Sequence, residues 1–212
     1  RIDTPNAYFH DQEARGVPDA RYVGELYFQA HRGTYTSQAR TKRGNRKSEL
    51  ALREAEMWGA AAQVLRGYQY PLALMDETWK KVLLNQFHDI IPGSSIHRVY
   101  EEAEAAYEQV IDTAEEIAGM AAGSFTDDSN AVTVFNSLAW ERKALVELPD
   151  YFAGAVDLDG QPMPVQFVEG TPCVEVQVPA CGWTSLRTVN LCESANLVKS
   201  KVTATERSLE NE

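Results

Sequence analysis

The chain has 212 residues, and its 20 Lys and Arg against 31 Asp and Glu give a formal net charge of −11 at pH 7. This acidic excess argues against nucleic acid as the main partner, because proteins that bind a phosphate backbone usually carry a basic patch or excess. Hydrophobic residues make up 44% and charged residues 24%, which is typical of packed globular proteins and argues against disorder. The longest apolar runs fall far short of the roughly 20 residues that span a bilayer, so no membrane segment is expected.

The first residues and the cysteines bear on processing and location. Residues 1–10 lack the layout of a secretory signal and contain no initiator Met, so we expect a processed product or a fragment of a longer chain. The three cysteines, Cys173, Cys181 and Cys192, include no C-x-x-C pair, so neither a disulfide framework nor a cysteine-rich zinc site is indicated. A reducing, cytoplasmic location is the simpler interpretation.

The first half of the chain has helical patterns. Thr4 and Pro5 predict a short first helix that ends near residues 16–18. Residues 23–29 could form a short strand, and residues 31–37 are interpreted as a loop. A long helix is predicted over residues 37–66, with one apolar stripe formed by Ala51, Ala55, Trp58, Ala62 and Leu65. Its first half is strongly basic, and we interpret it as a solvated or interdomain face rather than a polyanion site.

Two more long helices are predicted. Pro71 begins the second, which should run to Pro92 and Gly93. Its apolar face comprises Leu72, Met75, Trp79, Val82, Leu83, Phe87 and Ile90. Ser94 and Ser95 should cap the third, whose stripe is formed by Ile96, Val99, Ala103, Ala106, Val110, Ala114, Ile117 and Ala121. Three such helices with short connections predict an antiparallel three-helix bundle.

The second half of the chain has strand patterns. A polar linker is expected at residues 124–130, and Gly residues separate the runs that follow it. Five strands are predicted, at residues 131–136, 144–149, 164–169, 173–179 and 184–191. The tail, residues 199–212, has no apolar periodicity, and a sheet that ends there has an unfinished edge, which again suggests a longer chain. The expected class is α+β and multi-domain: the helix bundle followed by a partial antiparallel β-sandwich.

His88 is the strongest candidate for a functional residue. A lone histidine in the last turn of an apolar helix is more often a core or capping residue, but Asp89 follows it directly. An acid in the last helical turn opposes the helix dipole by about 0.3–1 kcal/mol, so a cation or a hydroxyl-rich ligand should compensate it. Neighbouring residues on a helix diverge by about 100°, so we expect His88 to serve a metal and Asp89 to serve hydroxyl groups.

Other polar residues are assigned local roles. His10 is expected on the surface, His97 in a local hydrogen bond, and the acidic residues of the third helix on a solvated face. The sequence contains no G-x-S-x-G, P-loop, H-E-x-x-H or dinucleotide-binding pattern, so no complete catalytic set is predicted.

Three segments resemble the α-mannosidases of glycoside hydrolase family 38. Residues 83–96, LLNQFHDIIPGSSI, are similar to the bacterial and cytosolic form of a motif in that family. Residues 31–39, HRGTYTSQA, match the segment that opens its central helical domain, and residues 133–140, TVFNSLAW, resemble the start of its C-terminal β region. The resemblance covers nearly the whole chain, in the same order.

The resemblance implies roles for particular residues. These enzymes are retaining exo-glycosidases with a zinc ion in the active site, so His88 is implied as a zinc ligand and Asp89 as a contact to hydroxyls of the terminal mannose. Phe87 stands where the Golgi and lysosomal form has a second histidine. Arg32 and Tyr35 are expected near the same cleft, as a hydrogen-bond donor and a stacking surface.

The resemblance also implies a domain arrangement. Residues 1–30 would end an N-terminal catalytic β/α domain, residues 31–123 would be the central helical domain, and residues 131–212 would begin the C-terminal β region. The nucleophile and most other zinc ligands of the family lie in the N-terminal domain. We therefore expect no catalytic residue here, no activity of this chain alone and weak zinc binding. The implied partners are an α-mannoside oligosaccharide and the missing catalytic domain.

Two other hypotheses remain open at this stage. One is a carbohydrate-binding β-sandwich module with a helical spacer. The other is a helical interaction module whose negative charge recruits a basic protein partner, although it leaves the pairing of His88 and Asp89 unexplained.

Overall fold

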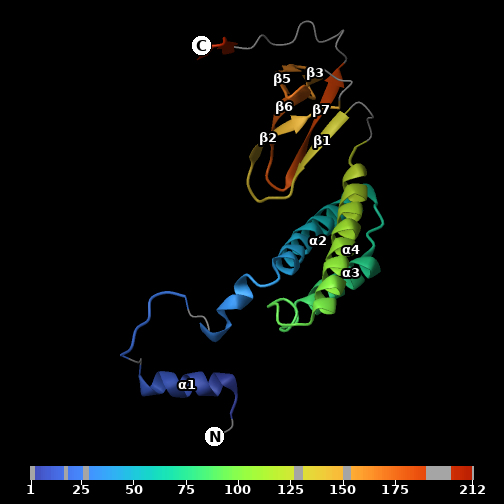
Figure 1. The fold of residues 1–212 in the computed structure, drawn as a ribbon. Helices are drawn as coiled ribbons and strands as arrows, with labels where there is room; N and C mark the ends of the chain where they lie inside the picture. Colours follow the sequence, from blue (N-terminus) through green and yellow to red (C-terminus); the bar gives the residue numbers. More distant parts are fainter. Residues whose placement is uncertain are drawn as a thin grey trace. The chain divides into compact units, whose positions relative to one another are not determined.

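Helices and antiparallel sheets make up the structure, which confirms the α+β class (Figure 1). The computed structural model describes residues 3–16, 19–25, 29–126, 131–149, 154–189 and 202–211. The chain divides into two compact units, Arg1–Thr36 and Ser37–Glu212. The finer domain boundaries stay predictions, and residues 127–130 of the expected linker lie outside the described residues.

The first unit contains α1 (Pro5–Arg15) and the 3₁₀ helix η1 (Gln29–Tyr35), which has a kink at His31. α1 begins as predicted, because Thr4 Oγ1 accepts a 3.3 Å hydrogen bond from the Ala7 N–H and Pro5 occupies the first turn. The loop expected at residues 31–37 is instead largely 3₁₀ helix.

The strand expected at residues 23–29 is wrong where the structure describes it. Residues 23–25 are not extended in a ladder, because Gly24 has φ +142° and the Tyr22 hydroxyl donates a 3.0 Å hydrogen bond to the Glu25 carbonyl. Residues 26–28 lie outside the described residues.

Three long helices form the helical part of the second unit: α2 (Ala39–Arg66), α3 (Leu72–Asn85) and α4 (His97–Gly123). The helices contact one another in pairs, and Figure 1 shows α4 beside α2 and α3. The α2 helix ends at Arg66, and Gly67 after it adopts the left-handed conformation that glycine tolerates without strain. Their shared core consists of Leu52, Ala55, Met75, Val82, Val110, Ala114 and Ile117.

The predicted apolar stripes include residues at the ends of the helices that are exposed rather than buried. Leu65 is 61% exposed, Leu72 is 71% exposed and Ile96 is 72% exposed. Each lies near a helix end, where neighbouring helices no longer cover it. In the first half of α4, Tyr100 and Tyr107 are buried and the expected Val99 and Ala106 are only half-buried, whereas Ala103 and Val110 are buried as predicted.

The β region contains two larger antiparallel sheets and a hairpin. Strand order is β1-β7-β3-β4 in one sheet and β2-β6-β5 in the other, and β8 pairs with β9. The bounds are β1 (Ala131–Asn136), β2 (Arg142–Glu147), β3 (Gly154–Val156), β4 (Pro162–Met163), β5 (Val165–Val168), β6 (Thr171–Val178), β7 (Gly182–Val189), β8 (Val202–Ala204) and β9 (Leu209–Asn211).

Five of these strands match the predictions closely, and β1 matches at both ends. Residues 190 and 191 of the expected last strand lie outside the described residues. The short strands β3, β4, β8 and β9 were not predicted. Along β6 the valines are buried while Glu175 and Gln177 are exposed, as the alternation predicted.

One hydrophobic core joins the two larger sheets. Leu148, Ala155, Val174, Val176, Val178 and Leu186 are its buried members. Cys173 is buried, Cys181 is exposed, and both are free thiols, whereas Cys192 lies outside the described residues. Among the residues that the structure describes, no helix is long and apolar enough to cross a membrane.

Candidate functional site

His88 and Asp89 lie in a series of turns that follows α3, at residues 86–96, which we name the His88 turn. The prediction that the helix continues to Ile90 is wrong, because α3 ends at Asn85. Within the turn, the Ile90 N–H donates to the Phe87 carbonyl at 2.9 Å, and the Gly93 N–H donates to the Ile90 carbonyl at 3.1 Å. The chain leaves the helix early because it folds back toward α2, where Gly93 lies against Ser37.

His88 and Asp89 face each other and are open to solvent. His88 Nε2 and Asp89 Oδ2 are 3.6 Å apart, and their side chains are 77% and 59% exposed. The expectation that they diverge is wrong, because it assumed a helical backbone at these two positions. The Phe87 ring lies beside the imidazole, with ring centroids 4.2 Å apart. The exposure argues against a core histidine and leaves both groups available to a ligand.

The donor atoms of this pair suit a zinc ion, but there are only two of them. Two ligands at about 2.1 Å from a tetrahedral zinc ion are about 3.4 Å apart, close to the 3.6 Å between His88 Nε2 and Asp89 Oδ2. Zinc sites use three or four protein ligands. The described residues contain no group of three or more His, Cys, Asp or Glu side chains that could hold a metal. Further ligands would therefore have to come from elsewhere.

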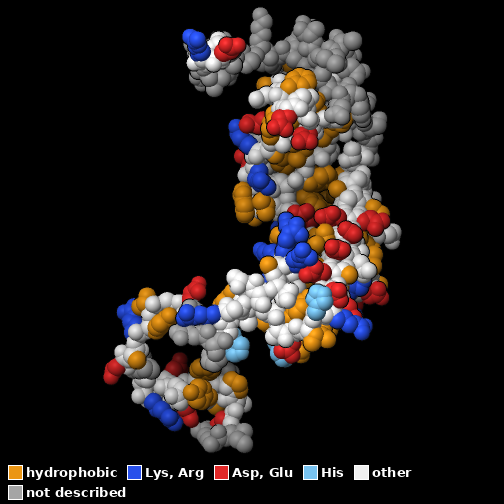
Figure 2. Space-filling view, viewed as in Figure 1, with side chains coloured by type: hydrophobic (Ala, Val, Ile, Leu, Met, Phe, Trp, Pro, Cys, Tyr) orange, Lys and Arg blue, Asp and Glu red, His pale blue; other side chains and the backbone are white. Residues whose placement is uncertain are grey.

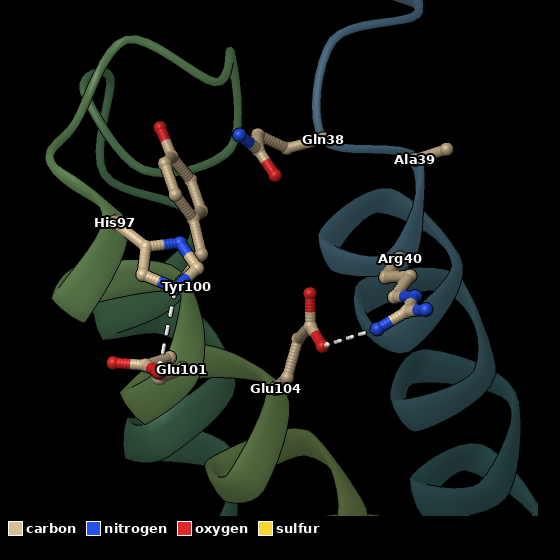
Figure 3. A pocket seen from close by; sticks show the side chains of 7 residues that line it. All are labelled: Gln38, Ala39, Arg40, His97, Tyr100, Glu101 and Glu104. Carbon is tan, nitrogen blue, oxygen red and sulfur yellow. Dashed lines mark ion pairs between the residues drawn. The ribbon is translucent and has the colours of Figure 1, made fainter.

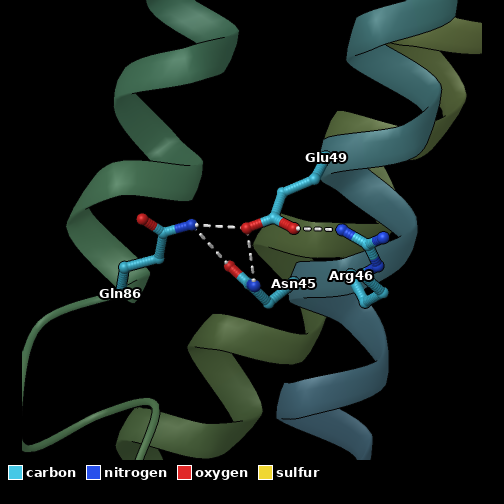
Figure 4. Close-up of polar contacts among 4 residues, drawn as sticks. All are labelled: Asn45, Arg46, Glu49 and Gln86. Atoms are coloured by element: carbon cyan, nitrogen blue, oxygen red, sulfur yellow. Dashed lines mark hydrogen bonds and ion pairs between the residues drawn. The ribbon is translucent and has the colours of Figure 1, made fainter.

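Polar contacts to α2 fix the beginning of the His88 turn (Figure 4). The Gln86 amide donates 3.0 Å hydrogen bonds to Asn45 Oδ1 and to Glu49 Oε1. Asn45 also donates to Glu49 Oε1 at 3.1 Å, and Arg46 donates to the other oxygen at 3.1 Å. Because Glu49 accepts from all three residues, Gln86 is tied to a preorganised group on α2.

The far end of the turn is fixed by α4. The Ser95 N–H donates a 2.6 Å hydrogen bond to the Tyr100 hydroxyl, and Ser95 Oγ donates one of 2.6 Å to the Asp89 carbonyl. Tyr100 is buried. The backbone of Asp89 is thus linked through Ser95 to a rigid position on α4.

Sequence reasoning assigned no role to Asn45 and Glu49, which lie within the basic first half of α2. For Asn45 a signal was present, because Thr41, Asn45 and Ser48 continue the spacing of the buried Leu52 toward the start of α2. They are small or polar, so a search for apolar residues passes over them.

Arg32 and Tyr35 belong to the first unit, and Tyr35 is 64% exposed. Their place near the cleft stays a prediction. His10 and His97 have exposed side chains and pair locally, with Glu13 at 3.5 Å and Glu101 at 3.4 Å, in line with the local roles expected for them.

A separate hollow of about 490 Å³ lies between the first turns of α2 and α4 (Figure 3). Arg40 and Glu104 point toward one another across it and pair at 3.7 Å. Its lining is Gln38, Ala39, Arg40, His97, Tyr100, Glu101 and Glu104, which excludes His88 and Asp89. Arg40 balances one of the two carboxylates in this lining, and Figure 2 shows basic and acidic side chains close together over the helical part of the second unit. The basic stretch is exposed at Arg40, Arg43, Arg46 and Lys47, as expected of a solvated face, whereas Lys42 is half-buried.

A family model and several curated proteins match the chain. The family model, described as "Alpha mannosidase middle domain", matches residues 29–125, which include the His88 turn. Alpha-mannosidase G from Dictyostelium discoideum is 43% identical over 111 residues, or 52% of this chain and 10% of that protein. Alpha-mannosidase 2C1 from Homo sapiens is 32% identical over 153 residues, or 70% of this chain and 15% of that protein. The chain therefore spans a small part of the length of these relatives.

Two solved structures share the fold. One, described as an alpha-mannosidase from Enterococcus faecalis, has a TM-score of 0.65 and 18% identity over 94% of this chain and 29% of that chain. The other, described as a protein in the Glycosyl Hydrolase Family 38 from the same species, has a TM-score of 0.61 and 18% identity over 96% of this chain and 30% of that chain.

Proposed function

Because the chain belongs to the α-mannosidases of glycoside hydrolase family 38, we propose that it is part of a zinc-dependent, retaining exo-α-mannosidase that removes terminal α-linked mannose from oligosaccharides. The observation that carries the proposal is the exposed His88–Asp89 pair, with a nitrogen and an oxygen donor 3.6 Å apart on a turn that α2 and α4 both hold.

His88 and Asp89 would have different tasks in this enzyme. The imidazole nitrogen of His88 would hold the zinc ion, whose chemistry when bound is that of a Lewis acid at sugar hydroxyl groups. The Asp89 carboxylate would accept hydrogen bonds from hydroxyls of the terminal mannose. Contacts that strengthen as the sugar ring distorts lower the barrier rather than only tighten binding.

The bond-breaking steps would need residues beyond these. In a retaining glycosidase a carboxylate attacks the anomeric carbon, the leaving group takes a proton from a second acid, and water then hydrolyses the glycosyl-enzyme. We propose that both carboxylates belong to an N-terminal catalytic domain, the main protein partner of this chain. The short span of the chain against its relatives and the two-donor limit of the described site support this.

Arg32 and Tyr35, which belong to the first unit, are proposed as further substrate-binding residues. Arg32 would donate hydrogen bonds to hydroxyl groups, and Tyr35 would offer a stacking surface to a sugar ring. Both belong to the segment that the family model covers, which begins at residue 29. The cytoplasmic location stays a proposal that rests on the pattern of cysteines.

We interpret the two parts of the second unit as a bundle and a sandwich. The pairwise contacts of α2, α3 and α4 support an antiparallel three-helix bundle. The core that both larger sheets share supports a partial β-sandwich.

Zinc content and hydrolysis of an aryl α-mannoside test the proposal in the complete polypeptide that contains these residues. His88→Ala should lose bound zinc and nearly all hydrolysis. Asp89→Asn should keep zinc and raise the KM for the mannoside, whereas a loss of zinc would make Asp89 a second ligand. His97→Ala is the matched control, because His97 is an exposed histidine with a carboxylate partner on α4. Unchanged zinc and activity in His88→Ala would refute the proposal.

A further inference from the structure

Lys42 joins the start of α2 to the His88 turn. Its ammonium donates a hydrogen bond to the Ser37 carbonyl, just before α2, and one of 2.8 Å to the Ile91 carbonyl, two residues after Asp89. Lys42 is half-buried, and this burial lowers the pKa of its side chain. Without the cation, two carbonyl oxygens with like partial charges would face each other across this contact with no donor between them.

The packing of Gly93 gives independent support for this contact. Gly93 has φ +95°, and a Cβ there would lie 2.8 Å from Ser37 Cβ and 3.2 Å from the Ser37 carbonyl carbon. The two backbone segments therefore approach as closely as glycine allows. The same residue, Ser37, is held by both the ammonium and the glycine.

The residue after Ser37 carries strain. Gln38 adopts left-handed angles, with φ 53° and ψ 58°, and its side chain makes no capping hydrogen bond to α2. A non-glycine residue holds such a conformation only where its surroundings fix it, and strained backbone of this kind gathers at functional sites. The bond from Lys42 and the packing of Gly93 on Ser37 are the contacts that would fix it.

We propose that Lys42 is a positioning residue of the mannosidase site: its ammonium ties the His88 turn to the start of α2 and so fixes where His88 and Asp89 stand. The role of Lys42 in catalysis rests on the proposed function. The role of Lys42 in holding the His88 turn does not, because it concerns only contacts within this chain. Lys47 lies on the same helix, but its side chain is exposed, whereas that of Lys42 is half-buried.

Amide hydrogen exchange in this chain tests the structural part. Lys42→Met should speed exchange of the amides of residues 86–96 about tenfold, because a hydrogen bond to a charged group shifts a local opening equilibrium by about that factor. Lys47→Met removes the same charge from the same helix and should leave these amides unchanged. If Lys42→Met does not fold, Gly93→Ala tests the same contact from the other side and should speed exchange in the same residues. Equal exchange in wild type and in the folded variant would overturn the inference.

Zinc competition with a chelator and steady-state kinetics test the functional part in the complete polypeptide. Lys42→Met should weaken zinc binding and lower kcat by about tenfold each with a smaller change in KM, since the turn carries the zinc ligand. Lys42→Arg, which keeps a cationic donor, should recover part of both losses. Wild-type zinc affinity and kcat in Lys42→Met would overturn the positioning role. If His88→Ala also behaved as wild type, the proposed function would fail with it, while hydrogen exchange would still decide whether Lys42 holds the turn.

Discussion

Trp58 of α2 meets Phe135 of β1 edge to face, with ring centroids 5.1 Å apart and ring planes at 70°. The ring of Phe125, just after α4, lies beside that of Trp183 of β7, with centroids 4.6 Å apart and ring planes at 39°, and completes the cluster. Beside it, Arg53 donates a 2.7 Å hydrogen bond to the Ser137 carbonyl. The helical part of the second unit and the β1-β7-β3-β4 sheet therefore share a hydrophobic core and are not joined by a linker alone.

Phe135→Ala should destabilise both parts together. Removing the ring should lower the free energy of unfolding by about 3 kcal/mol, the low end for a core Phe→Ala change, because Phe135 is only half-buried. Denaturant unfolding followed by circular dichroism measures the loss. Phe167→Ala is the matched control, since Phe167 is 58% exposed on β5, and it should cost less than about 0.5 kcal/mol. Equal losses in the two variants would mean that the junction is not a shared core.

Two helical glycines should respond in opposite directions to the same substitution. A Cβ on Gly44 would lie 2.6 Å from the Tyr107 ring, whereas a Cβ on Gly119 would have no neighbour within 4 Å. Gly44→Ala should therefore cost about 1–3 kcal/mol through overpacking. Gly119→Ala should gain about 0.5–1 kcal/mol, because alanine is the better helix former. Thermal unfolding of both variants checks the signs, and a stabilised Gly44→Ala variant would contradict the close packing of α2 on α4.

The long helices could be predicted because apolar residues recur every three or four positions over many turns. The end of α3 could not, since Phe87 and Ile90 continue that spacing beyond Asn85. The spacing of apolar residues does not indicate the tertiary contact between Gly93 and Ser37, where the chain bends back. The strands β3 and β4 were missed for another reason, because three and two residues are too few to show an alternation.

Some residues of the candidate site could likewise be predicted from the sequence, and others could not. His88 and Asp89 could be found from the sequence, because a metal-binding residue type lies beside a carboxylate in a recognisable segment. Lys42 and Glu49 could not, because lysines and glutamates on a helix are usually solvated, and only the fold shows which of them reach a neighbouring segment.

Tyr107 should make the protein sensitive to alkaline pH. Burial raises the pKa of Tyr107 to about 12 from its ordinary value of 10.0, and the negative charge of Glu49 adds to the effect. The folded state therefore keeps the proton that the unfolded state loses above pH 10, so this contribution to stability is complete below pH 10 and falls away toward pH 12. Between pH 10 and pH 12, this effect should lower the free energy of unfolding of the wild type by up to about 2–3 kcal/mol, and Tyr107→Phe should abolish that decrease.

The same variant should be at least as stable as wild type at pH 7. The Tyr107 hydroxyl is buried and has no hydrogen-bond partner among the described residues, and an unpaired buried hydroxyl costs about 1–3 kcal/mol. Urea unfolding at pH 7 and at several values above pH 9 measures both effects. Tyr8→Phe serves as the control, because Tyr8 is 58% exposed in α1. A marked loss of stability in Tyr107→Phe at pH 7 would show that the hydroxyl has a partner.

The chain by itself should bind zinc weakly and should not hydrolyse an aryl α-mannoside. His88 offers one nitrogen ligand and Asp89 at most one further donor, and a zinc ion that lacks most of its usual three or four ligands gains only part of the binding free energy. Calorimetry should find no submicromolar affinity, and the weak binding that remains should disappear in His88→Ala. Submicromolar binding in wild type would require ligands within these 212 residues that the pair does not supply. Hydrolysis above background by the purified chain would mean that a nucleophilic carboxylate lies among them as well, because a retaining mechanism cannot proceed without one.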